Sequence, residues 1–411
     1  MRPVQVLAGL LLMAGASWVT CELNLSAQVS SNINSKAAFE SKGTLPPDVY
    51  PDSRNRLAPI QRETLDERGK KAYDDAVARS DSGSGEPQGV AAILFHGSGV
   101  DVRWASPLGR GMTELAILTT ARERDQPYEW SLHEMEAVAV GLDPAVIDLV
   151  RHHKPLTGVD DKEAAVVQLN REIVGKHKLS PETYARGLKL LGESNLVDII
   201  LLMAQYSATA TRLTAFNQQM PPQMKQFLPL PFTPADDIHA DSRSRLPLIT
   251  MKEQVPGALY SRELAPTGTG PAQIRLHQAG RKSLEQHVGA RLMDLAILVT
   301  AREHDQQYDW TMTELAANKD GLEAATIEIV RDRKALSGLG EKEAAIIQLG
   351  RELFGKHMVS AETYARALKL FGETDLVDLV DLMAQHSAEA TLLTAFDQHL
   401  PEGQKALLPL P

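Results

Sequence analysis

Residues 175–216 read GKHKLSPETYARGLKLLGESNLVDIILLMAQYSATATRLTAF, and residues 355–396 read GKHMVSAETYARALKLFGETDLVDLVDLMAQHSAEATLLTAF. The second stretch follows the first by 180 positions (355 − 175 = 180). The same shift relates ELAILTTARERDQPYEW at residues 114–130 to DLAILVTAREHDQQYDW at residues 294–310. Copies this similar indicate one structural unit repeated in tandem, so positions at which their chemistry differs point to function.

The repeat divides most of the chain into two units, residues 46–232 and residues 233–411, each large enough to bury its own core. Their openings, SRNRL at residues 53–57 and SRSRL at residues 242–246, are related by a longer shift (242 − 53 = 189). The first unit therefore holds about nine extra residues (189 − 180 = 9). We assign them to the loop at residues 80–89, because it is rich in Ser and Gly.

The first residues have the pattern of an export signal. Arg2 precedes an apolar run over residues 4–19, which is too short to span a bilayer comfortably. We predict that residues 1–22 are a signal peptide and residues 23–45 a disordered spacer, and that the protein is exported, either periplasmic or secreted. Cys21, the only cysteine, lies at or near the predicted cleavage site.

Composition and helix punctuation both favour helices. Aromatic residues make up only 5% of the chain, whereas strands draw on aromatic and β-branched residues. Asp125, Asp160 and Ser180 are predicted N-caps of three helices. Gly192 is expected to end the third of these, and Asn195 is expected to begin the longest helix. The sequence contains no convincing strand pair, so the predicted fold class is all-α with two helical units.

Charge and composition exclude several kinds of partner. A net charge of −10 and a pI near 5.7 oppose a nucleic-acid partner, whose phosphates require a basic face. Beyond the N-terminal run, no stretch is long and apolar enough to cross a membrane. His152 and His153 lack a second pair at ligand spacing, so we expect no metal, and we expect no cofactor.

Residues 96–221 and 277–401 resemble the carboxymuconolactone decarboxylase family, which is related to the alkylhydroperoxidase D-like proteins. The likeness rests on ELAIL followed by YEW three residues before a histidine, with DKEAAVVQL and LVDIILLMAQYSATATRLTAF in support. It implies two tandem helical bundles of that type and a small-molecule substrate. It also implies a ring-like homo-oligomer, in which a trimer of tandem chains would mimic a hexamer.

Redox members of this superfamily use a Glu, then C-x-x-C, then a His four residues after the second Cys. By resemblance, these positions are Glu114, Gln126, Glu129 and His133. Both thiols are absent, so we do not expect peroxidase or peroxiredoxin activity through a disulfide relay. Decarboxylating members also lack the cysteines, and the resemblance therefore favours a lyase acting on a carboxylated lactone.

The remaining residues of that pattern, Glu114, Glu129 and His133, are the predicted catalytic set. Glu129 and His133 are four apart on one predicted helix and so share a face. The resemblance places Glu114 alongside, on the preceding helix. A buried Glu can hold a proton and a His can exchange one near neutral pH, which suits general acid–base catalysis. We expect decarboxylation or lactone opening, without a cofactor, in the first unit.

Other interpretations of the same residues stay open. A Glu and a His four apart on a helix are commonly a solvent-facing pair. Arg122, which recurs as Arg302, is predicted to bind a substrate carboxylate, or else to tie two helices together. The whole chain is alternatively a non-catalytic binding or scaffold protein of the same fold.

The second unit does not keep the catalytic set. Thr313 stands in the position of His133 and cannot act as an acid or base at ordinary pH. Asp294 and Asp309 are each one methylene shorter than the glutamates they replace. We therefore interpret the second unit as a structural or substrate-shaping half, and we expect the equivalent point to be smaller or filled by apolar side chains.

Overall fold

A computed structural model describes residues 45–79, 87–230, 236–249 and 270–410. Within these ranges the chain forms seventeen α-helices and one short 3-10 helix, and it forms no strand. The all-α prediction is therefore confirmed for the described part of the chain. The predicted signal peptide with Cys21, nearly all of the predicted spacer and most of the expected insertion lie outside that part. Among the helices described, none combines the length and the hydrophobicity that a membrane crossing requires.

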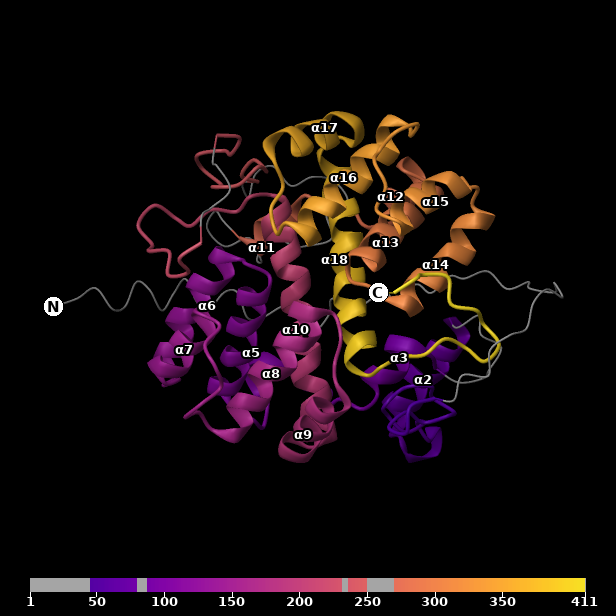
Figure 1. The fold of residues 1–411 in the computed structure, drawn as a ribbon. Helices are drawn as coiled ribbons and strands as arrows, with labels where there is room; N and C mark the ends of the chain where they lie inside the picture. Colours follow the sequence, from indigo (N-terminus) through magenta and orange to yellow (C-terminus); the bar gives the residue numbers. More distant parts are fainter. Residues whose placement is uncertain (1–44, 80–86, 231–235, 250–269, 411) are drawn as a thin grey trace.

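Six helices of the first half have counterparts that begin 180 residues later (Figure 1). The pairs are α5 (Arg110–Glu123) and α13 (Ala290–Glu303), α6 (Pro127–Ala139) and α14 (Gln307–Lys319), α7 (Pro144–Arg151) and α15 (Ala324–Arg331), α8 (Asp161–Lys176) and α16 (Glu341–Gly355), α9 (Pro181–Leu191) and α17 (Ala361–Phe371), and α10 (Glu193–Ala215) and α18 (Glu373–Ala395). The other elements precede each series: η1 (Arg62–Thr64), α2 (Glu67–Arg79), α3 (Gly89–Leu94) and α4 (Val102–Ala105), then α11 (Pro271–Leu276) and α12 (Arg281–His287). The repeat in the sequence is thus also a repeat of helix positions.

Two helix starts lie where the sequence places them. Asp160 caps α8 by accepting a hydrogen bond from the Lys162 amide at 2.8 Å. The Glu163 side chain accepts in return from the Asp160 amide at 3.3 Å, which completes a capping box. Ser180 caps α9, which ends directly before Gly192. Local sequence therefore determines these helix ends.

Two other predicted starts are wrong. Gln126, not Asp125, caps α6, because its side chain accepts an amide hydrogen of the first turn while Asp125 has a left-handed φ of 48°. Helix α10 begins at Glu193 and not at Asn195. Gly192 adopts a φ of 77°, which a residue without a Cβ tolerates, and this lets α9 turn directly into α10.

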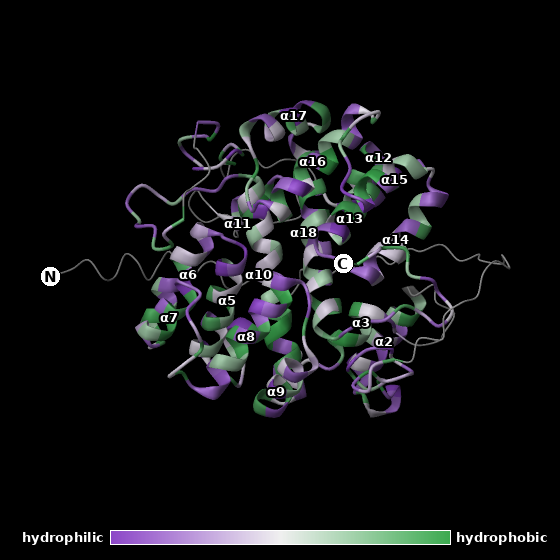
Figure 2. Cartoon of the chain, in the orientation of Figure 1, coloured by the Kyte–Doolittle hydropathy of each residue, from purple (hydrophilic) through white to green (hydrophobic). Residues whose placement is uncertain are grey.

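Peripheral helices have one hydrophobic and one hydrophilic side. Figure 2 shows both colours around α9 and α17, which lie at opposite ends of the molecule. In α9 the buried residues are Tyr184, Gly187 and Leu191, at spacings of three and four. This spacing places them on one face of the helix, which packs inward.

Helices α10 and α18 run side by side through the centre of the molecule, with α5–α8 on one side and α12–α15 on the other, while α9 and α17 lie at opposite ends (Figure 1). Each central helix also completes the hydrophobic core of the opposite half. The core around α5 and α8 includes residues from the second half of α18 and the residue after it, namely Ala384, Ala388, Leu392, Leu393, Ala395 and Phe396. The core around α13 and α16 includes residues from the end of α10 and the residue after it, namely Leu213, Ala215 and Phe216. The two halves therefore share their cores.

Two arms, residues 53–57 and 242–246, precede the paired helices and contact both halves. Each arm is closed by its first serine, whose hydroxyl donates to the carbonyl of its last leucine at 2.5 and 2.6 Å. The amide of Arg56 donates to the carbonyl of the residue after α18 at 2.9 Å. The amide of Arg245 donates to the carbonyl of the residue after α10 at 2.8 Å. The last leucine of each arm packs in the core of its own half, so each arm joins its own half to the helix end that comes from the other half.

The buried arginine of each arm bonds to the backbone of both halves. Arg56, whose side chain is 2% exposed, donates to the carbonyls of Leu179 and Ala395. Its Nε also pairs with Asp48 at 2.8 Å. Arg245 makes the corresponding contacts, with Val359, Ala215 and Asp237. These contacts give the SRNRL and SRSRL repeat a structural role that its sequence alone did not reveal.

Candidate active site

Helices α5 and α6 pack against each other and place the predicted catalytic residues between them. Residues 113–121 of α5 are all buried, and Glu114 among them has no exposed surface. Pro127, at the first position of α6, is preorganised for a helix start and fixes where this helix begins. Glu129 and His133 then lie one turn apart on the buried face of α6, at 2% and 7% exposure.

Glu114 and His133 form a buried pair. Nδ1 of His133 lies 2.7 Å from Oε2 of Glu114, and the ring of Tyr206 from α10 meets the imidazole edge-on at 5.0 Å between centroids. A carboxylate beside Nδ1 favours the tautomer that carries its proton there, which leaves Nε2 as the acceptor. Within the described structure Nε2 has no hydrogen-bond partner, and 8% of the side chain is exposed.

Two arginines surround Glu114. Nη2 of Arg110 lies 2.5 Å from Oε1 of Glu114 as an ion pair without hydrogen-bond geometry, and Nε of Arg103 lies 3.9 Å from the same oxygen. Burial alone would raise the pKa of Glu114, but His133 and the two guanidinium groups lower it to about 2. Glu114 is therefore a carboxylate at neutral pH.

Glu136 completes this charged cluster. Arg103 and Arg110 donate to its carboxylate at 2.8 and 2.7 Å. Glu114, His133 and Glu136 present oxygen and nitrogen atoms within 4.8 Å of one another, a spacing compatible with metal ligands. Because the two guanidinium groups already neutralise these carboxylates and would repel a dication, the set does not fit a metal ion.

Glu129 differs from the other members of the set. Both of its carboxyl oxygens are buried, and neither has a hydrogen-bond partner in the described structure. Burial raises the pKa of Glu129 well above its ordinary value, although the charges of Arg124 and Arg103 oppose the rise. Burial therefore favours the protonated form of Glu129, whereas the surrounding charges hold Glu114 as a carboxylate. Two carboxyl groups whose environments shift their pKa values in opposite directions, on helices that also carry an imidazole, are the components of an acid–base site.

Replacing Glu129 with glutamine is expected to change how stability depends on pH. Between the ordinary carboxyl pKa of 4.5 and the raised pKa, the folded protein holds a proton that the unfolded chain has lost. The free energy of unfolding therefore falls as the pH rises through this window, by about 1.4 kcal/mol per pH unit for one proton. Glutamine cannot ionise, so E129Q should lack this component. Denaturant unfolding of both proteins from about pH 5 to about pH 9 measures the difference.

The exposed Glu182 of α9 provides the matched control. E182Q should unfold with the pH profile of the parent protein, because Glu182 remains in contact with solvent in the folded state. Identical pH profiles for the parent and E129Q would contradict a buried, protonated Glu129.

The structure does not bring Arg122 to this set. Its Nε donates to the carbonyl of Arg151 at 2.9 Å, and its Nη1 bonds to Asp125. Arg302 makes the same two contacts, with Arg331 at 2.7 Å and with Asp305. Each guanidinium thus ties the end of one helix to the end of another, in agreement with the structural alternative for this residue.

In the second half, the equivalent point is not filled by apolar side chains, so this one of the two alternatives expected for it was wrong. His386 from α18 reaches it, and Nδ1 of His386 lies 3.0 Å from Oδ2 of Asp309. Thr313 Oγ1 lies 3.5 Å from the other oxygen of Asp309, and Asp294 has a buried oxygen without a hydrogen-bond partner. The expectation failed because the imidazole comes from a different helix, at the position that corresponds to Tyr206 (386 − 206 = 180).

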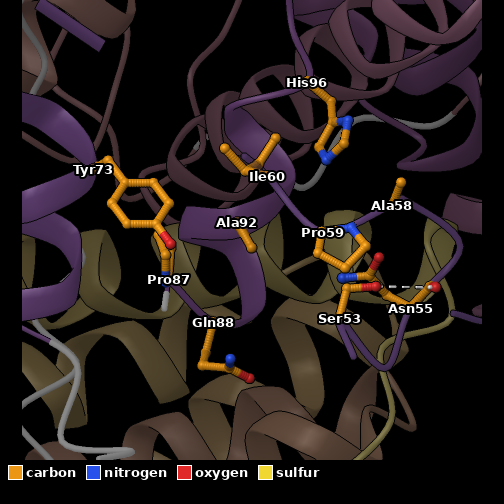
Figure 3. Close-up of a pocket in the computed structure, with 10 residues that line it drawn as sticks. All are labelled: Ser53, Asn55, Ala58, Pro59, Ile60, Tyr73, Pro87, Gln88, Ala92 and His96. Atoms are coloured by element: carbon orange, nitrogen blue, oxygen red, sulfur yellow. Dashed lines mark hydrogen bonds between the residues drawn. The ribbon is translucent and has the colours of Figure 1, made fainter. Parts of the chain in front are cut away.

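Two hollows in the described structure lie away from the set. The first has a volume of about 350 Å³ including space open to solvent, and Figure 3 shows it between the first arm, α2 and α3, with Ser53, Tyr73 and His96 among its walls. The second is lined by residues of both halves, among them Arg124 and His304. Glu114, Glu129 and His133 line neither hollow. Of the three residues, His133 is the most exposed, at 7% within the described structure.

Sequence reasoning missed Arg103, Arg110, Glu136 and Tyr206. Arg110 is four residues before Glu114, a spacing that places both on one helix face and was visible in the sequence. Arg103 and Tyr206 come from α4 and α10, so only the fold brings them to the site. The change from Tyr206 to a histidine in the second copy was also visible through the repeat, but its meaning depends on where α10 and α18 pack.

Comparison of this chain with protein-family models, with curated proteins and with solved structures found no match. Membership of the carboxymuconolactone decarboxylase family therefore stays a prediction from the quoted segments. The chemistry of the site has to be argued from its own residues.

Proposed function

We propose that the protein is an acid–base enzyme that decarboxylates a small carboxylated substrate or opens its lactone ring, with its active site in the first half. The observation that carries this proposal is Glu129, a buried carboxyl group with both oxygens unpartnered, one helical turn from a paired histidine. Buried polar groups are nearly always hydrogen-bonded, and an exception of this kind calls for a functional explanation.

The three residues have distinct roles in this proposal. Glu114, held as a carboxylate by Arg103 and Arg110, fixes the orientation and the tautomer of His133. His133 then accepts or returns a proton through Nε2. Glu129, kept neutral by burial, donates a proton.

Decarboxylation shows how the proton balance works. The bond between the substrate carbon and its carboxylate breaks, carbon dioxide leaves, and the electron pair stays on the carbon. Glu129 donates a proton to that carbon and becomes a carboxylate, which recovers a proton from solvent through His133. In lactone opening, His133 instead takes a proton from the attacking water, and Glu129 protonates the leaving oxygen.

The resemblance extends the proposal to the setting of the enzyme. We propose that the protein works as an exported, periplasmic or secreted homo-oligomer, a trimer of tandem chains, in which the second half supports the first. The N-terminal apolar run and the tandem repeat support these two points.

A non-catalytic scaffold of the same fold is the second candidate. The observation in its favour is that the set lines neither hollow and is almost entirely buried. A buried Glu114–His133 pair with two arginines would then serve only to join α4, α5 and α6.

A panel of carboxylated lactones and 3-oxo acids, incubated with the full protein, tests the proposal. For at least one member we expect decarboxylation or loss of the lactone ring. Proton NMR measures either reaction through the signals of the substrate and its product. A parallel assay with an organic hydroperoxide and a dithiol donor should show no turnover, because this sequence lacks the C-x-x-C that redox members of the superfamily use. Turnover that depends on the dithiol would contradict the proposal, and no turnover of any panel member would favour the scaffold.

A further inference from the structure

The second half has its own cluster of ionisable side chains at the point that corresponds to the candidate active site. Position 206 faces this point in the first half, where the Tyr206 ring lies 5.0 Å from that of His133. Its counterpart, His386, occupies the same place on α18. The second half therefore also has one imidazole at this point, but it comes from α18, whereas the imidazole of the first half comes from α6.

Three side chains converge in this cluster. Nδ1 of His386 lies 3.0 Å from Oδ2 of Asp309 and 3.6 Å from Oε2 of Glu389. His386 and Glu389 are three residues apart on α18 and so share a face, while Asp309 comes from α14. The nitrogen and the two oxygens all lie within 4.8 Å of one another.

We propose that Asp309, His386 and Glu389 bind a divalent transition-metal ion, with zinc as the best fit. Zinc binds histidine nitrogen and carboxylate oxygen at about 2.0–2.2 Å in tetrahedral sites, so neighbouring ligand atoms lie about 3.4 Å apart. The distances of 3.0 and 3.6 Å around His386 bracket this value. Three protein ligands leave the fourth position to a water molecule or another small ligand.

The charge around this cluster differs from that of the first half. There, Arg110 and Arg103 neutralise Glu114 and Glu136. The repeat replaces Arg110 by alanine at position 290 and Glu136 by alanine at position 316, and it adds Glu389 in place of a threonine. One carboxyl group has thus been replaced by another at a different position, while the paired arginine has been lost.

Arg281 of α12 is a cation near this cluster. Its charge acts on both His386 and Glu389, but it forms no ion pair with Asp309, His386 or Glu389 in the described structure. Asp294, with one buried oxygen unpartnered, is a further carboxyl group on which the charge of His386 acts. Carboxyl groups around one imidazole, without a paired arginine, can exchange the protons they hold for a dication.

The cluster lies partly at the surface. The side chains of His386 and Glu389 are 12% and 19% exposed, and that of Asp309 is 9% exposed. In contrast, Glu114 has no exposed surface.

Metal titration of the full protein tests the proposal without any substrate and independently of the proposed enzyme activity. After treatment with a chelator, the protein should bind one Zn²⁺ per chain in equilibrium dialysis. Co²⁺ should give the intense visible absorption of a tetrahedral site. H386Y and E389T, which each restore the residue of the first half, should weaken Zn²⁺ binding at least about 100-fold.

H133T provides the control, because it alters the other group of potential ligands. It should bind Zn²⁺ as the parent protein does, and equal weakening in H133T would overturn the assignment. Absence of Zn²⁺ binding by the parent, or unchanged binding in both H386Y and E389T, would also overturn it. If H386Y fails to fold by circular dichroism, E389T decides the outcome, since Glu389 lies nearer the surface.

Discussion

Replacing His133 with threonine, the residue of the second copy, is expected to lower turnover of a responsive substrate by about two orders of magnitude or more. The variant keeps Glu114 but loses the imidazole whose Nδ1 contacts it and whose Nε2 is free to exchange a proton. Since the structure buries His133, we also expect a loss of about 1.5–3 kcal/mol in the free energy of unfolding, the usual value for a hydrogen bond to a charged group. Steady-state kinetics with denaturant unfolding measures both effects.

A matched variant separates chemistry from stability. His152, whose side chain is 46% exposed, lies outside the set, and H152T should retain parental turnover and stability.

E129Q should lose activity as H133T does, because glutamine cannot donate the proton. Parental turnover in a folded H133T would contradict the catalytic role, and an unfolded H133T would show that the pair with Glu114 serves the fold.

Replacing Arg56 or Arg245 with alanine is expected to destabilise the protein by about 3–5 kcal/mol in each case. Either change removes a buried guanidinium, leaves the paired aspartate without its partner, and leaves carbonyls of both halves without a donor. The two losses should be similar, because the arms make corresponding contacts. Denaturant unfolding at pH 7 measures them.

Arg186 is the control for this pair of variants. Its ion pair with Asp161 is exposed, at 45% and 80% of the two side chains, so R186A should change stability by no more than about 0.5 kcal/mol. Losses below about 1 kcal/mol in both R56A and R245A would show that the arms are not needed to hold the halves together.

The sequence predicts those features that depend on neighbouring residues. The capping box of Asp160 and the Ser180 cap are local, so their spacing alone identified them. The neighbouring helices α5 and α6 placed Glu114 against His133, as the resemblance implied. At the start of α6 the local signal was ambiguous, because Asp125 and Gln126 can both cap a helix and only the backbone conformation decides between them.

Contacts between distant parts of the chain could not be predicted from the sequence. Arg56 reaches the end of α18, more than three hundred residues away, with a contact at a separation of 339. His386 replaces an aromatic residue in the repeat, which has no evident meaning until α18 packs against α14. Both features depend on how the two halves exchange segments, and the period of the repeat does not specify that exchange.

The exchanged helix ends place the two sites under different constraints from those in an assembly of identical chains. In such an assembly every substitution occurs twice, so a histidine lost from one site is lost from its twin. In a covalent tandem the two copies can change independently. Position 133 holds a histidine while position 313 holds a threonine, and position 386 holds a histidine while position 206 holds a tyrosine. Neither half can be discarded, because each fills the core of the other. The architecture thus permits specialisation of each site while selection maintains the common scaffold.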